Sequence, residues 1–156
     1  MISIFISHKK EDGETAALIA KELNRINVHC YLDLLDTKMT KNGKELTDHI
    51  KNNLNKCTDI IVVMSEITKL SQWVPFEVGM SAQKDMPTAT FLQANVSLPE
   101  YLEYWPRLKK PEDILEYVKT RNEVYLRYDN RGLYESVQFN TSQTERFYAK
   151  LKERLN

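Results

Sequence analysis

The chain has 156 residues, 42% of them hydrophobic, and its 22 basic and 22 acidic side chains give a formal net charge of zero. This length and composition predict one ordinary globular domain, and because basic residues are not concentrated anywhere, we expect no binding to nucleic acid. No apolar run approaches the roughly 20 residues of a membrane span, no signal peptide is evident, and the two cysteines lack metal-binding spacing, so we expect a cytoplasmic protein with neither membrane contact nor a zinc site.

The first half of the chain alternates between strand and helix patterns. Short β-branched and aromatic runs indicate buried strands, and apolar residues at spacings of three and four indicate helices. The clearest strand has four consecutive β-branched residues at its centre, from Ile60 to Val63. The predicted elements in order are strand 2–6, helix 16–26, strand 28–32, helix 46–54 and strand 59–64.

The second half begins regularly and then loosens. A helix is predicted to start near Ser71, with Pro75 in its first turn, and a strand follows over 88–92. After a proline-punctuated loop, a helix is predicted from Pro111, while the tyrosine-rich segment 124–134 fits no single element. The final helix is marked by a capping box, Ser142 with Glu145, followed by apolar residues at four-residue spacing.

This alternation predicts an α/β fold, a parallel sheet with helices on both faces. Ligands of such sheets bind at the carboxyl ends of the strands, which directs attention to residues 7–11, 33–42 and 65–77. The chain has only four glycines, and none forms a GxGxxG or P-loop motif, so a Rossmann dehydrogenase and a P-loop NTPase are excluded. A response-regulator receiver is excluded too, because the first strand ends in Ser-His-Lys-Lys rather than in an acidic pair.

The segment from Trp73 to Glu77 is the strongest candidate for chemistry. On a helix these two residues are i and i+4, so an aromatic ring and a carboxylate project from one face. Such a pair suits the cleavage of an N-glycosidic bond, in which a carboxylate stabilises an oxocarbenium-like transition state. The alternative is that Glu77 is a solvated helix residue and Trp73 a packing residue.

Two loops after strands offer further polar candidates. Ser7, His8 and Lys10 follow the first strand, where they could bind phosphate or ribose or simply form a polar loop before the next helix. Asp33 and Asp36 follow the second strand, where acidic residues often hold ribose hydroxyls but also form turns.

The order of these motifs resembles a bacterial TIR domain. The motifs are Ile4-Phe5-Ile6-Ser7-His8, Tyr31-Leu32-Asp33, the serine-ended strand of 59–65, and the Trp-x-x-x-Glu helix of 71–79. The resemblance covers residues 1–120, and a short chain of this kind is similar to the TIR component of Thoeris-type antiphage systems. The remaining residues, 121–156, are expected to form a helical extension packed on the same domain.

The resemblance implies a flavodoxin-like fold with a five-stranded parallel sheet and extra C-terminal helices. It also implies cleavage of NAD+ at the nicotinamide–ribose bond, with NAD+ as substrate and with no cofactor or metal. Carried over by position, Glu77 becomes the catalytic glutamate, and the substrate-binding residues become Ser7, His8, Lys10, Asp33, Asp36 and Trp73.

The resemblance further implies a homo-oligomer formed through TIR–TIR contacts and a cyclic ADP-ribose-type signal. At this length we expect that signal to reach an effector on a different polypeptide. Two alternatives remain open: a non-catalytic TIR scaffold, and an enzyme like a nucleoside deoxyribosyltransferase. The polar loop of 37–43 lacks the Arg-Asp-Pro-Gly motif of animal signalling TIR domains, which favours the enzymatic branch over the scaffold.

Overall fold

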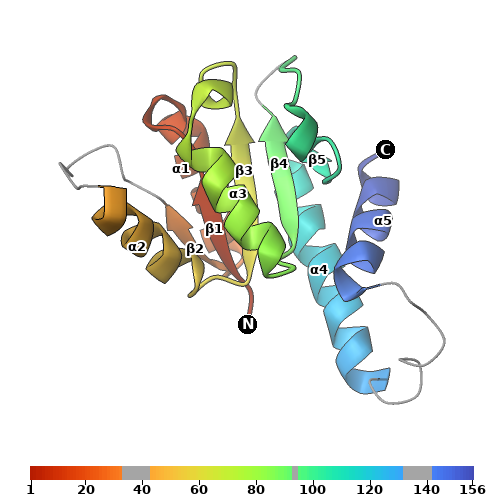
Figure 1. Ribbon diagram of the computed structural model, residues 1–156. Coiled ribbons are helices and arrows are strands. Elements are labelled where there is room, and N and C mark those ends of the chain that lie inside the picture. Colours follow the sequence, from red (N-terminus) through yellow and green to blue (C-terminus); the bar gives the residue numbers. More distant parts are fainter. Residues whose placement is uncertain (33–42, 93–94, 132–141) are drawn as a thin grey trace.

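The computed structural model describes residues 1–32, 43–92, 95–131 and 142–156. Its centre is a five-stranded sheet in the order β2-β1-β3-β4-β5, and every neighbouring pair is parallel (Figure 1). This is the flavodoxin-like strand order, in which the direction of winding reverses between β1 and β3. The strands are β1 (Ser3–Ser7), β2 (His29–Leu32), β3 (Asp59–Met64), β4 (Thr88–Leu92) and β5 (Arg107–Leu108).

Helices cover both faces of the sheet (Figure 1). One face carries α1 (Gly13–Arg25), α4 (Pro111–Arg131) and α5 (Gln143–Leu155). The other carries α2 (Gly43–Leu54) and α3 (Trp73–Gln83). Two short 3-10 helices, η1 (Lys10–Asp12) and η2 (Thr68–Leu70), lie in the loops that follow β1 and β3.

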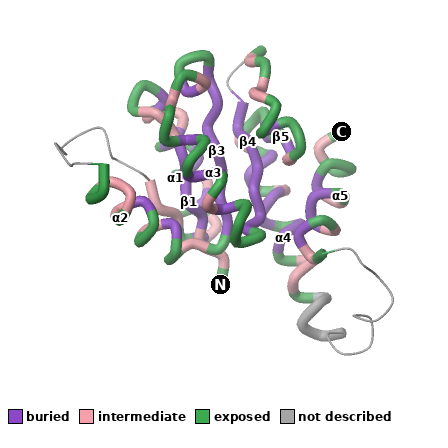
Figure 2. Tube along the Cα trace, viewed as in Figure 1, coloured by how far each residue is buried: buried purple, intermediate pink, exposed green. Residues whose placement is uncertain are grey.

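Alternation along the central strands divides the apolar core into two layers. In β3, Ile61 and Val63 pack toward α1, α4 and α5, whereas Ile60, Val62 and Met64 pack toward α2 and α3. Every residue of β3 is buried, and in Figure 2 the sheet forms the buried centre of the molecule. This burial on both faces explains why β3 reads as a continuous apolar run in the sequence.

The predicted elements are largely confirmed. The strands over 59–64 and 88–92 have the predicted bounds, and α3 contains Pro75 in its first turn. The ambiguous segment begins as helix, because α4 continues without a break to Arg131 and crosses residue 120. The fifth strand, with only two residues, lies in the segment that the sequence indicated as loop. No described helix has the length and apolarity needed to cross a membrane.

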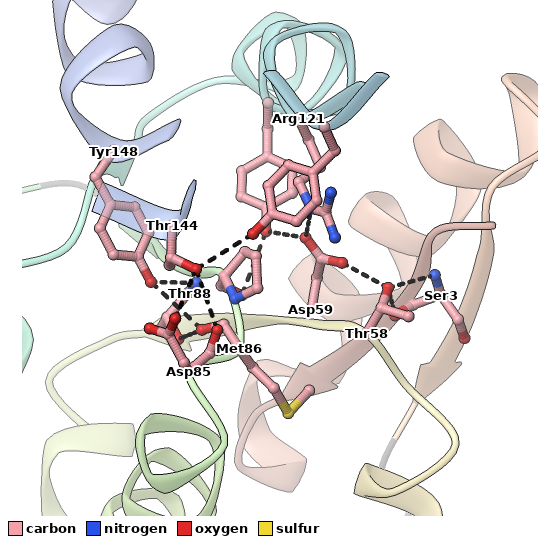
Figure 3. Close-up of polar contacts among 12 residues, drawn as sticks. Ser3, Thr58, Asp59, Asp85, Met86, Thr88, Arg121, Thr144 and Tyr148 are labelled. Carbon is pink, nitrogen blue, oxygen red and sulfur yellow. Dashed lines mark hydrogen bonds and ion pairs between the residues drawn. The ribbon is translucent and has the colours of Figure 1, made fainter. Parts of the chain in front are cut away.

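A buried ion pair closes the amino-terminal end of the central strands (Figure 3). Asp59 opens β3 with its side chain fully buried, and Arg121 of α4 donates from Nε to its Oδ1 at 2.9 Å. The hydroxyls of Tyr117 and Thr58 also donate to this carboxylate, at 2.9 and 2.5 Å. Burial raises the pKa of Asp59 above its usual value, while Arg121 and the two hydroxyls act in the opposite direction.

Helix α5 is part of the same packed body. Phe147, Tyr148 and Leu151 are buried against the sheet and α4. The Tyr148 hydroxyl accepts a hydrogen bond from the Thr88 amide at 2.9 Å (Figure 3). This bond gives the amide of the first residue of β4 a hydrogen-bond partner. The helix begins as predicted, since the Ser142 side chain accepts from the Glu145 amide at 3.1 Å.

The attachment of α5 to α4 predicts a pH-dependent stability. Lys150 and Arg154 donate to Glu123 at 2.6 and 2.7 Å and lower the pKa of this carboxyl to about 2, from 4.5. Since the folded pKa lies below the unfolded one, the stabilisation is complete above 4.5 and is lost as the pH falls toward 2. Wild type is therefore expected to be more stable than Glu123→Gln near neutral pH, and this difference is expected to close with acidification.

Urea midpoints measured across that pH range test this expectation. The matched control is Glu153→Gln, an exposed glutamate on α5 that forms no ion pair with another described residue. A stability difference between wild type and Glu123→Gln that stays constant down to the acid limit would contradict the role given to the two cations.

Candidate active site

The carboxyl ends of β1 and β3 meet at the point where the winding of the sheet reverses. These two strands are direct neighbours, with Ser7 paired to Val62 at the end of β1. The loop after β1 leads through η1 into α1, and the loop after β3 leads through η2 into α3. The predicted ligand-binding region of the fold is therefore built from these two loops and the first turns of the helices that follow them.

Glu77 and Ser7 lie together at this point. Glu77 is in the second turn of α3 and is only 3% exposed, and Ser7 is completely buried at the end of β1. The Ser7 hydroxyl donates a short hydrogen bond to Oε2 of Glu77. The prediction that α3 brings this glutamate to the strand ends is consistent with this contact, and the alternative of a solvated helix glutamate is wrong.

The first turn of α3 places two aromatic side chains near the surface. Trp73 is 36% exposed and Phe76 is 38% exposed, and their rings meet edge to face at 5.7 Å. The Ser71 hydroxyl accepts from the amides of Trp73 and Val74, both at 3.3 Å, and so fixes the start of the helix. The exposed Trp73 ring, one helical turn from the buried Glu77 carboxylate, can stack on a planar ring while the carboxylate faces the sugar attached to it.

The structure shows less about the other predicted substrate-binding residues. His8 follows Ser7 directly, and its Nδ1 lies 3.2 Å from the Ile6 carbonyl oxygen. Lys10 is exposed in η1. Asp33 and Asp36 lie outside the described residues, so their predicted roles stay predictions.

A buried polar cluster at the same end of the sheet as Ser7 was missed by the sequence analysis. Asp12 is 4% exposed, and its Oδ2 accepts hydrogen bonds from the hydroxyls of Ser65, at 2.5 Å, and Thr68. Asp12 stands one residue beyond the window of 7–11 that the strand-end rule selected. An acidic residue just before a helix ordinarily indicates a cap, yet no capping bond from this side chain is found here.

Within the described ranges, no three His, Cys, Asp or Glu side chains are grouped so that they could hold a metal ion.

The fold and this strand-end site define a flavodoxin-like α/β protein with a buried glutamate at its topological switch point. The sequence profile of the TIR domain matches residues 4–134, most of the chain. The chain therefore belongs to the TIR domain family. No curated protein sequence matches it.

Three solved structures are similar to this one. A metazoan TIR-STING receptor from C. gigas has a TM-score of 0.58 at 18% identity over 80% of this chain and 46% of its own, so the chain spans about half of that receptor. A 2-deoxyribosyltransferase from the psychrotolerant bacterium Bacillus psychrosaccharolyticus has a TM-score of 0.57 at 11% identity over 72% of this chain and 89% of its own. The TIR domains of the activated Roq1 resistosome, which directly recognises the pathogen effector XopQ, give a TM-score of 0.48 at 10% identity over 98% of this chain and 84% of theirs.

Proposed function

We propose that this chain cleaves NAD+ at the bond between nicotinamide and ribose. The observation that carries the proposal is the buried Glu77 carboxylate, held by the Ser7 hydroxyl at the carboxyl end of β1. The TIR family includes both NAD+-cleaving enzymes and scaffolds, and a scaffold has no need for a buried carboxylate fixed at the ligand-binding edge of the sheet. Burying a glutamate away from water lowers the stability of the fold. The presence of a buried glutamate at this position therefore favours a functional role.

The proposed reaction is dissociative. As the C1′–N1 bond breaks, its electron pair returns to the pyridinium nitrogen, and neutral nicotinamide leaves without needing a proton. The ribose is left as an oxocarbenium ion, which Glu77 stabilises electrostatically in a site partly shielded from water. Ser7 fixes the orientation of the carboxylate, and Trp73 stacks on a planar ring of the substrate.

The ion then reacts with a nucleophile at C1′. Attack by water gives linear ADP-ribose and a proton. Attack by a ribose hydroxyl of the same molecule closes a ring and likewise releases a proton, whereas attack by an adenine nitrogen closes a ring and leaves the positive charge on the adenine. We propose the cyclic outcome and a role for the product as a diffusible signal to a separate effector in antiphage defence. This last step is supported by the resemblance of the sequence motifs to those of the TIR component of Thoeris-type systems.

A non-catalytic role in assembly is the second candidate, and a specific surface favours it. Four apolar side chains near the start of α3 are exposed, namely Ile67, Leu70, Trp73 and Phe76. TIR domains commonly oligomerise through TIR–TIR contacts. We propose that this chain self-associates through this surface, and that assembly and catalysis coexist because two of its residues, Trp73 and Phe76, lie on the same helix as Glu77.

Incubation of the purified protein with NAD+, followed by chromatography for nicotinamide, tests the proposed function. Release is expected for wild type and is expected to be lost in Glu77→Ala. Mass spectrometry against cyclic and linear standards then identifies the nucleotide product. Absence of release at high protein concentration would overturn the enzymatic proposal, and turnover of deoxynucleosides in its place would indicate a deoxyribosyltransferase.

Trp73 is expected to contribute to substrate affinity. Because stacking of a base on an aromatic ring contributes about 1–3 kcal/mol, Trp73→Ala should raise the KM for NAD+ at least about fivefold, with a smaller change in kcat. Trp73→Phe keeps a ring and should recover most of this affinity.

The matched control for Trp73→Ala is Leu126→Ala, which removes an exposed apolar side chain on α4, across the sheet. Measurements at several protein concentrations separate an effect on binding from an effect on assembly. An unchanged KM in Trp73→Ala would exclude this residue from the substrate site.

A further inference from the structure

Asp12 joins the two loops that flank the proposed active site. It stands where η1 passes into α1, and its carboxylate receives both hydroxyl donors from the loop after β3. The partners Ser65 and Thr68 are 53 and 56 residues away in sequence. All three side chains are buried, with Ser65 and Thr68 exposed by 7% and 0%. These contacts therefore form a link, shielded from water, across the switch point of the sheet.

The Ser65 hydroxyl also binds the backbone of its own loop. It donates its one proton to Asp12 and accepts hydrogen bonds from the amides of Ile67 and Thr68, at 3.2 and 3.1 Å. A hydroxyl has one donor and two acceptor positions, so all of its capacity is used. The carboxylate of Asp12 sets the direction of the Ser65 proton and thereby turns the acceptor positions toward the two amides.

The loop held in this way leads directly into α3. η2 ends at Leu70, and Ser71 then fixes the first turn of α3 through the amides of Trp73 and Val74. One turn later the same helix carries Glu77, whose carboxylate is held by Ser7 of β1. Asp12 and Ser7 thus hold the two ends of one segment, Ser65 to Glu77. Both belong to β1 and the loop that follows it.

We propose that Asp12 is a positioning residue for the reaction at Glu77. It fixes the segment between β3 and α3, so that the Glu77 carboxylate and the Trp73 ring keep the spacing that the transition state requires. Small displacements of a catalytic group reduce the rate of the chemical step more than they reduce substrate affinity. This inference rests on the proposed NAD+ cleavage for its kinetic consequences, but its structural part does not.

The kinetic test compares three variants. Asp12→Ala is expected to lower kcat about 10- to 100-fold with KM changed less than about twofold. Asp12→Asn should recover most of this loss, because both hydroxyls donate to one oxygen and an amide oxygen can accept two hydrogen bonds. Thr68→Val keeps the side-chain shape and removes one donor, so its effect should be smaller than that of Asp12→Ala, and the two effects should not add.

Asp113→Ala is the matched control for a general loss of stability. Asp113 is also a buried aspartate, and its Oδ2 also accepts two hydrogen bonds, from the amides of Lys109 and Lys110 at 2.8 and 3.2 Å. It stands at the start of α4, just after the edge strand β5, and both of these hydrogen bonds lie within its own turn. At a temperature where both variants are folded, Asp113→Ala should keep the wild-type kcat. Equal loss of kcat in the two variants, or full kcat in Asp12→Ala, would overturn the proposal.

Hydrogen exchange supplies a measurement that does not depend on activity. In Asp12→Ala the amides of Ile67 and Thr68 should exchange at least about tenfold faster, while those of β4 stay as in wild type. If wild type releases no nicotinamide, the proposed function fails, and this exchange result alone decides whether Asp12 holds the segment. Unchanged exchange at both amides would refute the inference even in an active enzyme.

Discussion

Glu77→Gln is expected to reduce nicotinamide release about 100- to 1,000-fold, with little change in KM. Glutamine keeps the length of the side chain and an oxygen that can accept the Ser7 hydrogen bond, so the fold and the bound substrate should be retained. What it lacks is the negative charge that, in the proposed mechanism, stabilises the ribosyl cation. The loss should therefore fall on kcat, and single-turnover measurement of nicotinamide will show it directly.

The control for this variant is Glu66→Gln. Glu66 is an exposed glutamate in the loop after β3, and its ion pair with Lys69, at 3.3 Å, lies at the surface. Its replacement should leave both kinetic constants within about twofold of wild type, since exposed pairs contribute little. If Glu77→Gln keeps most of the wild-type rate while folding normally, the negative charge plays no part in the reaction and the proposed mechanism is wrong.

Arg121→Met is expected to have the largest effect on stability, lowering the free energy of unfolding by about 3–5 kcal/mol. Methionine fills much of the same volume but leaves the fully buried Asp59 carboxylate without its counter-charge. Urea denaturation at neutral pH, with an unchanged m-value, is the measurement. The difference in unfolding free energy between wild type and Arg121→Met should narrow as the pH falls. Burial already raises the pKa of Asp59 above 3.8, and removal of the guanidinium raises this pKa further. A carboxyl whose folded pKa lies above its unfolded pKa stabilises the fold on protonation.

Two further variants distinguish this ion pair from a general effect of losing a cation on α4. Lys119→Met removes an exposed partner of Glu116, at 3.9 Å, and should change stability by less than about 1 kcal/mol. Adding Asp59→Asn to Arg121→Met should restore part of the loss, since no uncompensated charge then remains. A double variant less stable than Arg121→Met would mean that packing, rather than the unpaired charge, causes the loss.

The elements that were predicted well are those whose apolar pattern is complete over four or more residues. Strands 59–64 and 88–92 are buried on both faces, and their β-branched, aromatic and other apolar residues marked both strands in the sequence. β5 has two residues, which is too short for any periodicity, and only the family resemblance supplied a fifth strand. The helical start of the tyrosine-rich segment was obscured because its residues pack partly on α5, a contact that local spacing does not encode.

The candidate site divides in the same way. Ser7, Trp73 and Glu77 could be proposed from the sequence because the strand-end rule and the helical i, i+4 spacing are local signals. The contacts of Asp12 with Ser65 and Thr68 join segments more than 50 residues apart, and each residue alone resembles an ordinary loop residue. Only the pairing of β1 with β3 brings these side chains together.

The two ends of β3 have a consequence for how the sheet finds its alignment during folding. A strand that is apolar on both sides can slide by a residue without exposing anything to water, so its hydrophobic pattern specifies its register poorly. In this chain the sliding is penalised at the termini, because Asp59 must meet Arg121 at one end and Ser65 must meet Asp12 at the other. A shift of one position would leave two buried carboxylates, Asp59 at one end and Asp12 at the other, without their partners. The most hydrophobic strand of the protein is thus aligned by its polar neighbours, and the hydrogen bond that holds the loop after β3 also disfavours a misaligned sheet.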